Sequence, residues 1–326
     1  MAHSVDNSKL TVNPALFTIG IDVSKQHLDA ARHPTGETLR VDNTRKGHSA
    51  LLRWIGDPGR VQRVVFESTG PYHRSLEDRL SAQGLPVAKV NPRQARRFAE
   101  AIGTLAKTDR VDALMLARFG ALLEPIVQAA PTACQIQLCE LVAARRALVK
   151  DRTATLNRLQ MLSIQILKRH AQHRLRQIAA QIISIERELE TLISTDPVLV
   201  RRHQVLKSIP GLGATTAHTL LATMPELGTL EEGQAASLAG LAPMTRESGT
   251  WRGKSTIRGG RGGLRQALYM PALVAMRFNP DIKRVYERLV ARGKHAKVAI
   301  VAAMRKLIVL ANALIRDDRI WTPRSA

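Results

Sequence analysis

Apolar and polar residues alternate in the first third of the chain in a way that predicts a compact succession of strands and helices. FTIGID, from Phe17, is a buried strand, and HLDAARH and ETLRV follow as shorter strands around the turn-like PTG. A helix-like stretch over 47–55 precedes the apolar strand VQRVVFE, and a helix starting at 68–71 precedes the strand LPVAKV. Helices over 92–103 and 109–122 complete the block. This order predicts a mixed α/β sheet covered by helices.

The middle of the chain has a different pattern, because residues 134–195 contain almost no Gly or Pro and keep a long helical period. Apolar residues spaced by three and four form a strict seam in its second half: Leu175, Ile178, Ile182, Ile185, Leu189 and Leu192. The preceding helix places Arg145, Arg152 and Thr155 in the same register, and a seam arginine needs an anionic neighbour. The segment predicts a helical coiled-coil arm, either an antiparallel hairpin within one chain or a dimer contact.

Beyond Asp196, the stretch LKSIPGLGATTAHTLLATM predicts a helix-hairpin-helix, with one helix ending at Ile209 and the next starting near Ala214. Gly211 and Gly213 would let backbone amides approach a phosphate at the positive end of the second helix. The alternative is a plain glycine turn. A basic, Gly-rich stretch follows, and its glycines favour extended loops lying against a nucleic-acid backbone.

Four regions result from these patterns. We expect a flexible leader over 1–14, an α/β domain over 15–125, the arm over 130–196, and a mainly helical domain over 197–326. The fold class is therefore α/β followed by α.

The charge balance adds a partner to this picture. The 326 residues include 49 Lys and Arg against 27 Asp and Glu, a formal net charge of +22, which favours nucleic acid over a membrane surface. Only 3% of residues are aromatic, so we expect phosphate contacts and shape to dominate over base stacking. The candidate nucleic-acid contacts in the Gly-rich stretch are Arg246, Arg252, Lys254, Arg258, Arg261 and Arg265.

Compartment signals favour the cytoplasm. Cys134 and Cys139 match neither a zinc pattern nor a disulfide framework, which fits a reducing environment. The leader MAHSVDNSKLTVNP has no apolar core, so we expect no signal peptide. The apolar stretch 296–314 is interrupted by Arg305 and Lys306 and is expected to be a core helix.

Four acids form the strongest candidate for catalytic chemistry. Asp22 lies in the middle of the first strand, where burial is costly unless the carboxylate is paired or binds a cation. Glu67 ends the fourth strand, and Asp109 and Asp112 share one helix face. This is the arrangement of RNase H-like nucleases, in which carboxylates hold divalent metals, and Mg²⁺ suits such oxygen ligands.

Each acid also has a simpler interpretation. The two helix acids could be N-terminal acids behind the cap Thr108, and Glu67 could pair with an arginine. Asp29 and Asp42 are expected to be surface acids. The order of the four acids on this strand pattern favours the metal site over these alternatives.

Several motifs resemble those of one family of bacterial insertion-sequence transposases. GIDVSK, FESTGPYH and KTDRVDA resemble the DEDD motifs of its RuvC-like domain, and SIPGLG, GLAPMTRESG and GGLRQALYMPALVAM resemble its C-terminal transposase domain. The resemblance covers nearly the whole chain in the same order. It implies a catalytic, metal-binding tetrad and a serine nucleophile: Asp22, Glu67, Asp109, Asp112 and Ser248. It departs downstream, where the family often has Ser-Lys-x-Gly and this chain has Ile257–Arg258–Gly259–Gly260.

The resemblance implies an RNA-guided DNA recombinase. In such an enzyme the serine attacks a DNA phosphodiester and forms a phosphoserine, the acids hold Mg²⁺, and a guide (bridge) RNA pairs with donor and target DNA. A homodimer or tetramer is also implied.

From the residues alone, Ser248 is an ordinary turn residue, with Thr250 and Ser255 as rivals, but the surrounding arginines would stabilise an attacked phosphate. Two alternatives stay open. One is a Mg²⁺-dependent nuclease of the Holliday-junction type without a covalent intermediate, and the other is a non-catalytic nucleic-acid-binding protein.

Overall fold

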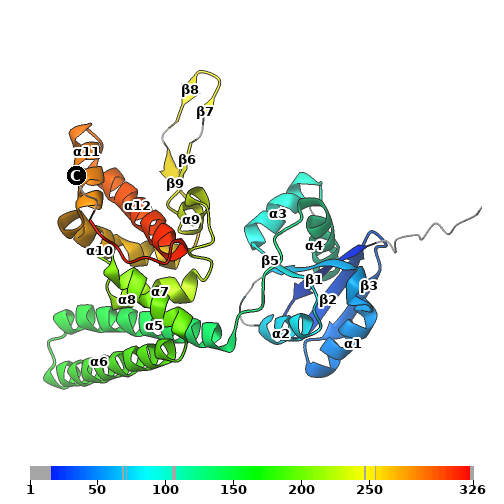
Figure 1. Ribbon diagram of the computed structural model, residues 1–326. Coiled ribbons are helices and arrows are strands. Elements are labelled where there is room, and N and C mark those ends of the chain that lie inside the picture. The colour runs from blue at the N-terminus through cyan, green and yellow to red at the C-terminus, as the bar shows by residue number, and fades with distance from the viewer. Residues whose placement is uncertain are drawn as a thin grey trace, which may run out of the picture. The chain divides into compact units, whose positions relative to one another are not determined.

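The computed structural model describes residues 16–67, 70, 72–104, 108–245, 247–253 and 255–323. The chain divides into two compact units, one within residues 1–131 and the other within 132–326. Figure 1 shows the elements of each unit. The expected leader over 1–14 lies outside the described residues.

The first unit is built on a mixed sheet of five strands in the order β3-β2-β1-β4-β5. The strands β1 (Phe17–Val23), β2 (His27–His33) and β3 (Thr38–Asp42) form an antiparallel meander. The strands β4 (Val61–Glu67) and β5 (Val87–Val90) run parallel to β1. The strands and their order along the chain confirm the mixed α/β sheet that the apolar pattern predicts.

Helices cover both faces of this sheet. On one face, the larger core of this unit includes residues of α1 (Arg45–Ile55) and α2 (Arg74–Ala82). On the other face, a smaller core includes residues of α3 (Pro92–Ala101) and α4 (Asp109–Leu123). A short 3₁₀ helix, η1 (Pro58–Arg60), leads into β4. The helix α2 begins at Arg74, later than expected. Residues 68, 69 and 71 of the expected start lie outside the described part of the chain.

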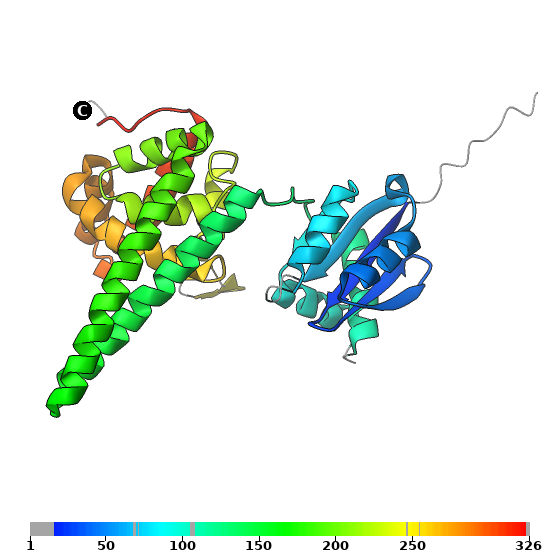
Figure 2. The ribbon, with the colours of Figure 1, turned by 90° about the horizontal axis from the view of Figure 1, so that it is seen from below.

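The second unit begins with two long helices, α5 (Ala133–Met161) and α6 (Gln165–Ser194), which lie side by side as an antiparallel hairpin within the chain (Figures 1 and 2). The predicted seam of α6 faces inward, with Ile178, Ile182 and Leu189 buried. Arg145 meets its anionic neighbour there, because its guanidinium bonds Glu186 at 2.6 and 2.8 Å. Of the other two polar residues predicted in this seam, Thr155 is buried, but Arg152 is exposed, so its predicted place in the seam is wrong.

The described part of this unit continues with α7 (Pro197–Ser208), α8 (Ala214–Thr223), α9 (Glu232–Leu238), α10 (Gly262–Phe278), α11 (Pro280–Ala291) and α12 (Ala296–Arg316). The helices α7 and α8 pack on the base of the hairpin, and the others pack on these two and on one another. Leu138 of α5 and Leu189 of α6 belong to the same core as these helices. The start of α8 at Ala214 confirms the sequence prediction.

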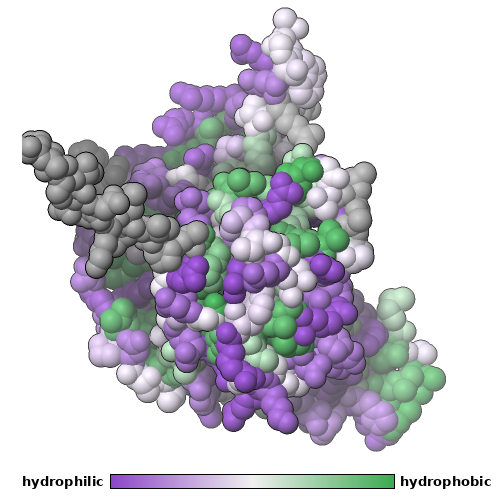
Figure 3. All heavy atoms as spheres, turned by 90° about the vertical axis from the view of Figure 1, so that its right-hand side faces the viewer, coloured by the Kyte–Doolittle hydropathy of each residue, from purple (hydrophilic) through white to green (hydrophobic). Residues whose placement is uncertain are grey.

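Among the described helices, α12 is the one long and apolar enough to cross a bilayer. Its buried residues, which include Ala303, Leu307 and Ile308, pack into the core of the second unit. The face of the molecule in Figure 3 is mainly hydrophilic, with apolar side chains in scattered patches. The structure thus favours the expected core helix over a membrane span.

A narrow β-hairpin, called here the finger, projects between α9 and α10 of the second unit (Figure 1). At its base β6 (Pro243–Met244) pairs with β9 (Thr256–Ile257), and at its end β7 (Glu247–Ser248) pairs with β8 (Trp251–Arg252). The sequence predicts extended loops here, and the structure instead pairs them antiparallel.

Candidate active site

Close approach of α4 to β1 creates the acidic site of the first unit. Gly20 faces α4, and a Cβ there would collide with the backbone of Ala113 and Ala117. Side chains alternate along a strand, so Asp22, two residues later, lies on the same face as Gly20. The first turn of α4, which carries Asp109 and Asp112, is fixed by its cap Thr108, whose hydroxyl accepts from the amide of Val111.

Glu67 lies at the neighbouring strand end. The strands β1 and β4 are parallel, with Ile21 opposite Phe66, so Asp22 and Glu67 are the next residues on adjacent strands. Both side chains are half-buried. The sheet therefore brings these two acids to the same edge, as the sequence predicts.

Asp29 is a third acid in the same row, and the expectation of a surface position for it is wrong. It lies directly opposite Asp22 on β2 and is only 8% exposed. Arg40, its partner on β3, donates to Asp29 Oδ2 from Nε at 3.1 Å and from Nη2 at 2.8 Å. The same Nη2 lies 2.6 Å from Oδ2 of Asp109. Asp42 is exposed as expected.

Burial and the close acids of this row raise the pKa of Asp22. Burial is the largest cause, and the negative charges of Asp112, Asp109 and Asp29 add to it, raising the pKa of Asp22 from 3.8 to about 6. A carboxylate surrounded by other carboxylates is the donor set that a hard divalent cation prefers. The described residues around Asp22 thus have the donor chemistry that a hard divalent cation needs, although Arg40 bonds Asp109 in this structure.

The four tetrad carboxylates are not drawn together as tightly as ligands of one ion. Among the described residues, no three of these acids have carboxylate oxygens that all lie within 4.8 Å of one another. A pocket of about 360 Å³ opens beside Arg40 and Asp109, between β2, β3 and the start of α4. Of the acids discussed here, Asp29 and Asp109 line this pocket.

Ser248 lies near the end of the finger. It pairs with Trp251 across a two-residue turn of Gly249 and Thr250, and all four residues are exposed. Gly249 has φ of +55°, the left-handed conformation that such tight hairpin turns require and glycine adopts readily. The rival Ser255 bonds Thr245 across the hairpin at 3.0 Å.

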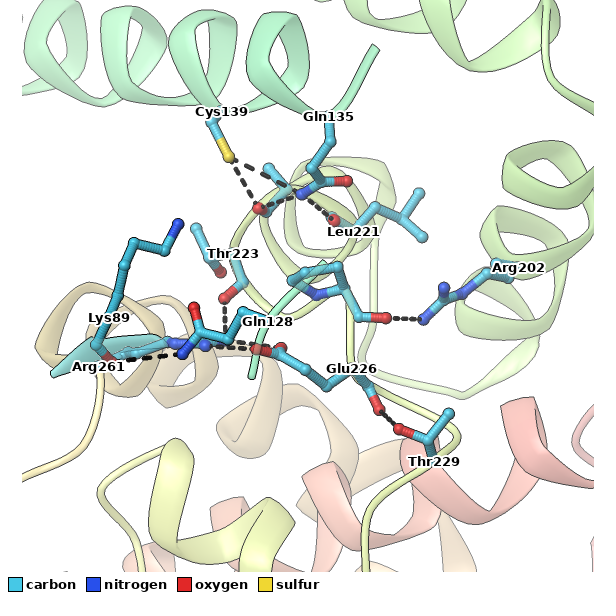
Figure 4. Close-up of polar contacts among 12 residues, drawn as sticks. Lys89, Gln128, Gln135, Cys139, Arg202, Leu221, Thr223, Glu226, Thr229 and Arg261 are labelled. Atoms are coloured by element: carbon cyan, nitrogen blue, oxygen red, sulfur yellow. Dashed lines mark hydrogen bonds and ion pairs between the residues drawn. The ribbon is translucent and has the colours of Figure 1, made fainter. Parts of the chain in front are cut away.

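Two arginines identified from the sequence hold the base of the finger. Arg261 donates two hydrogen bonds to the Glu226 carboxylate, at 2.7 and 2.9 Å, and one to the Thr223 carbonyl (Figure 4). The hydrogen bond to Glu226 raises the pKa of Arg261. Arg265 donates to the carbonyls of Gly240 and Gly259, at 3.1 and 3.2 Å. These guanidinium groups are engaged with the protein itself.

The other basic candidates differ from these two. Arg252 and Arg258 are exposed on the finger and just after it. Arg246 and Lys254 lie outside the described residues.

The two glycines between α7 and α8 have different surroundings. Gly211, at φ +104°, is pressed against α10, where a Cβ would lie 2.7 Å from the Pro271 carbonyl oxygen. Gly213 caps α8 and is exposed, with open space where a Cβ would lie. Gly211 therefore has a packing role, and Gly213 is the one open to a ligand.

Comparison with known proteins gives these features a family. A family model described as a transposase, of the DEDD type of insertion element IS110, matches residues 19–170, and a model described as "Transposase IS116/IS110/IS902 family" matches residues 203–287. The pilin gene-inverting protein of Moraxella bovis is 32% identical over 319 residues, which are 94% of this chain and 98% of that protein. The chain belongs to the IS116/IS110/IS902 family of transposases.

Other relatives agree with this membership. The pilin gene-inverting protein of Moraxella lacunata is also 32% identical over 319 residues, with the same coverage of 94% and 98%. The uncharacterized 43.6 kDa protein of insertion element IS110 from Streptomyces coelicolor is 35% identical over 144 residues, 43% of this chain and 34% of that protein. A DNA transposase or recombinase activity follows from the family.

This transposase also contains a group of charged residues, on the face of the sheet that α2 covers, that sequence reasoning missed. Glu77 of α2 is buried, and Lys89 of β5 pairs with it at 2.7 Å, while His73 lies 3.7 Å away. Lys89 lies opposite Phe66, one residue before Glu67. The signal was available, because a lysine inside the apolar strand VAKV needs an acidic partner when it is buried.

Proposed function

We propose that this transposase is an RNA-guided DNA recombinase that cuts donor and target DNA and rejoins them through a covalent phosphoserine. The observation that supports this best is the row of acids around Asp22, whose mutual repulsion a bound cation would relieve. The exposed hydroxyl of Ser248, near the end of the finger, is the matching candidate for the nucleophile.

In this proposal the first unit is an RNase H-like, RuvC-like domain, which its strand order β3-β2-β1-β4-β5 supports. The four tetrad carboxylates, Asp22, Glu67, Asp109 and Asp112, would hold Mg²⁺. When bound, Mg²⁺ would polarise the scissile phosphate and stabilise the charge on the attacking and leaving oxygens. Arg40 would hold Asp29 and Asp109 in position, because it already bonds both carboxylates.

The serine step conserves the energy of the broken bond. The Oγ of Ser248 would bond to the phosphorus as the hydroxyl gives up its proton, and the bond from phosphorus to one deoxyribose oxygen would break. That oxygen would take a proton and leave as a hydroxyl. In the reverse step a hydroxyl of another DNA end would attack the phosphoserine and release the serine. No external energy source is required, which suits an exchange of strands.

The basic residues would position nucleic acid around the serine. Arg252 and Arg258 are exposed and would contact phosphates, together with Arg246 and Lys254. Arg261 and Arg265 would add positive charge at the base of the finger that they hold. The turn between α7 and α8 would serve as a helix-hairpin-helix, with Gly213 at the phosphate and Gly211 packed behind it.

The partners in this proposal are donor DNA, target DNA and a guide RNA, bound by a homodimer or tetramer in the bacterial cytoplasm. The net charge of +22 supports binding of several nucleic-acid strands at once. The relatives named for pilin gene inversion support DNA inversion as one outcome of the same strand exchange.

The test uses full-length protein with guide RNA, both DNA substrates and Mg²⁺. After denaturation, wild-type protein should migrate as a protein–DNA adduct that protease removes. Ser248→Ala should bind RNA and DNA normally but give neither adduct nor recombinants. The matched hydroxyl controls Thr250→Ala and Ser255→Ala should keep the adduct.

Three results would contradict the proposal in different ways. An adduct in Ser248→Ala would assign the nucleophile elsewhere. Cut ends without any adduct in the wild type would favour a Mg²⁺-dependent nuclease of the Holliday-junction type, and binding without cleavage would favour a non-catalytic protein.

A further inference from the structure

Three helices of the second unit bring together a group of side chains that the recombinase chemistry does not use. Glu190 comes from α6, His203 from α7 and His218 from α8. One carboxylate oxygen and one ring nitrogen from each histidine all lie within 4.8 Å of one another. The two imidazole rings are stacked, with their centroids 5.0 Å apart.

Both histidines are buried with polar atoms that lack hydrogen bonds. His203 is 7% exposed and His218 is 3% exposed. Within the described part of the chain, Nε2 of His203 and both ring nitrogens of His218 have no hydrogen-bond partner. Buried polar groups are nearly always satisfied, and an unsatisfied one destabilises the fold. A bound ligand would supply the missing partner.

Glu190 is the acid nearest to the two rings. Glu190 Oε1 lies 3.2 Å from Nε2 of His218, outside hydrogen-bond geometry. Burial is the largest cause that lowers the pKa of both histidines, and the Glu190 carboxylate acts against it by raising the pKa of both. Glu186 is the other nearby acid and is bonded to Arg145 at 2.6 Å.

We propose that Glu190, His203 and His218 form a Zn²⁺ site that joins the end of the helical hairpin to the α7–α8 pair. Two imidazoles and one carboxylate are a donor set typical of zinc, with a fourth position left for water. The set differs from the all-oxygen acids around Asp22, which suit Mg²⁺. The zinc site is independent of the proposed recombinase chemistry.

Zinc binding would draw the three side chains together. Ligand atoms of one tetrahedral zinc lie about 3.4 Å apart. In this structure the three ligand atoms lie within 4.8 Å of one another, so they would have to move closer. Glu190 has the freedom to move, because its side chain is 52% exposed, and it also opens the site to solvent. The ion would then fix α6 against the turn that carries Gly211 and Gly213, which gives the site a structural role.

The experiment measures Zn²⁺ binding to tag-free, full-length protein after chelator treatment, with excess Mg²⁺ to occupy the acidic site. Calorimetry should give one tight Zn²⁺ per chain, and Zn²⁺ should raise the thermal unfolding midpoint. Substitution of Co²⁺ should give the visible absorption bands of a tetrahedral site with nitrogen ligands. Glu190→Gln should weaken binding at least about tenfold, and His218→Gln should remove it.

Matched controls separate this site from other histidines and acids. Glu188→Gln and His173→Gln change exposed residues of the same helix and should bind Zn²⁺ as the wild type does. Asp22→Asn should also keep Zn²⁺, whatever it does to recombination. Equal Zn²⁺ affinity in the wild type and Glu190→Gln, or no tight Zn²⁺ in the wild type, would overturn the proposal. If His218→Gln does not fold, the result for Glu190→Gln decides the test, because Glu190 is half-exposed and its substitution should be tolerated.

Discussion

The acidic row of the first unit and the finger of the second are built in opposite ways. The acids lie on a five-stranded sheet, where Gly20 lets α4 pack against the strand that carries Asp22. Ser248 lies on a strand of two residues beside a glycine turn and is exposed. The first region holds charges in a fixed, strained arrangement, and the second presents a hydroxyl on a narrow support.

The contrast teaches where each kind of chemistry is placed. Binding a cation needs rigid ligands, and a packed sheet supplies the rigidity at the cost of repulsion between acids. In the proposed reaction, attack on a bulky duplex needs access, and a thin hairpin held at its base by Arg261 and Arg265 would supply it. The predictions below test these two roles separately.

The largest expected effect is on the acids. Asp22→Asn, Glu67→Gln, Asp109→Asn and Asp112→Asn should each lower strand cleavage by about 10²–10⁴-fold, because metal stabilisation of the transition state amounts to several kcal/mol. Binding of guide RNA should stay near that of the wild type. Asp42→Asn, an exposed acid on the same sheet, is the control. Near-normal recombination by any two tetrad variants would refute the metal site.

Salt should weaken RNA binding strongly, because a charge of +22 with 3% aromatic residues makes phosphate contacts dominant. If about six phosphates are contacted, each doubling of salt should lower affinity about 20-fold. Titrations from low to moderate salt measure this. A flat profile would remove the electrostatic account of binding.

A pH effect on stability should isolate the repulsion around Asp22. Because its folded pKa of about 6 lies above 3.8, the folded state binds more protons between these values, and stability falls as pH rises through this window. Without divalent metal, Asp22→Asn should therefore be more stable than the wild type above about pH 7, by about 1–2 kcal/mol once solvent screening of this half-buried group is allowed for. The gain should be smaller at pH 5.

Denaturant unfolding of both proteins in chelator measures this difference. Mg²⁺ should stabilise the wild type more than the variant. A variant that is less stable than the wild type at every pH would show that Asp22 is satisfied within the fold.

The smallest effect should separate binding arginines from supporting ones. Arg252→Gln should lower nucleic-acid affinity modestly and reduce the slope of its salt dependence by about one, with unfolding unchanged. Arg261→Gln should instead destabilise the second unit, because Glu226 loses its partner. Nucleic-acid affinity and unfolding would be measured for both variants. If Arg252→Gln and Arg261→Gln changed these two properties in the same way, the division would be contradicted.

Much of the first unit could be predicted from the sequence, because its strands are long apolar runs and its helices have clear caps such as Thr108. The burial of Asp29 could not, because it depends on the register that sets Asp29 opposite Asp22 and Arg40. Polar and apolar residues alternate in HLDAARH only from His27 to Ala30, so the pattern does not settle which face of the strand Asp29 takes.

The finger was harder to predict for a physical reason. Its strands are two residues long and bury almost nothing, so no apolar pattern marks them. The only feature of the finger's sequence that is typical of a β-hairpin is the dipeptide Gly249–Thr250, which can form a two-residue turn. The group of Glu190, His203 and His218 is spread over three helices and has no local motif, so only the fold brings it together.

The most direct test of the central claim, that the acids and Ser248 serve one reaction, is the covalent adduct itself. Wild-type protein and Asp22→Asn would each be incubated with guide RNA, DNA and Mg²⁺, digested with protease and nuclease, and analysed by mass spectrometry. We predict a nucleotide linked to the peptide that contains Ser248 in the wild type, and none in Asp22→Asn. A linkage on another residue, or an equal Ser248 adduct in Asp22→Asn, would contradict the account.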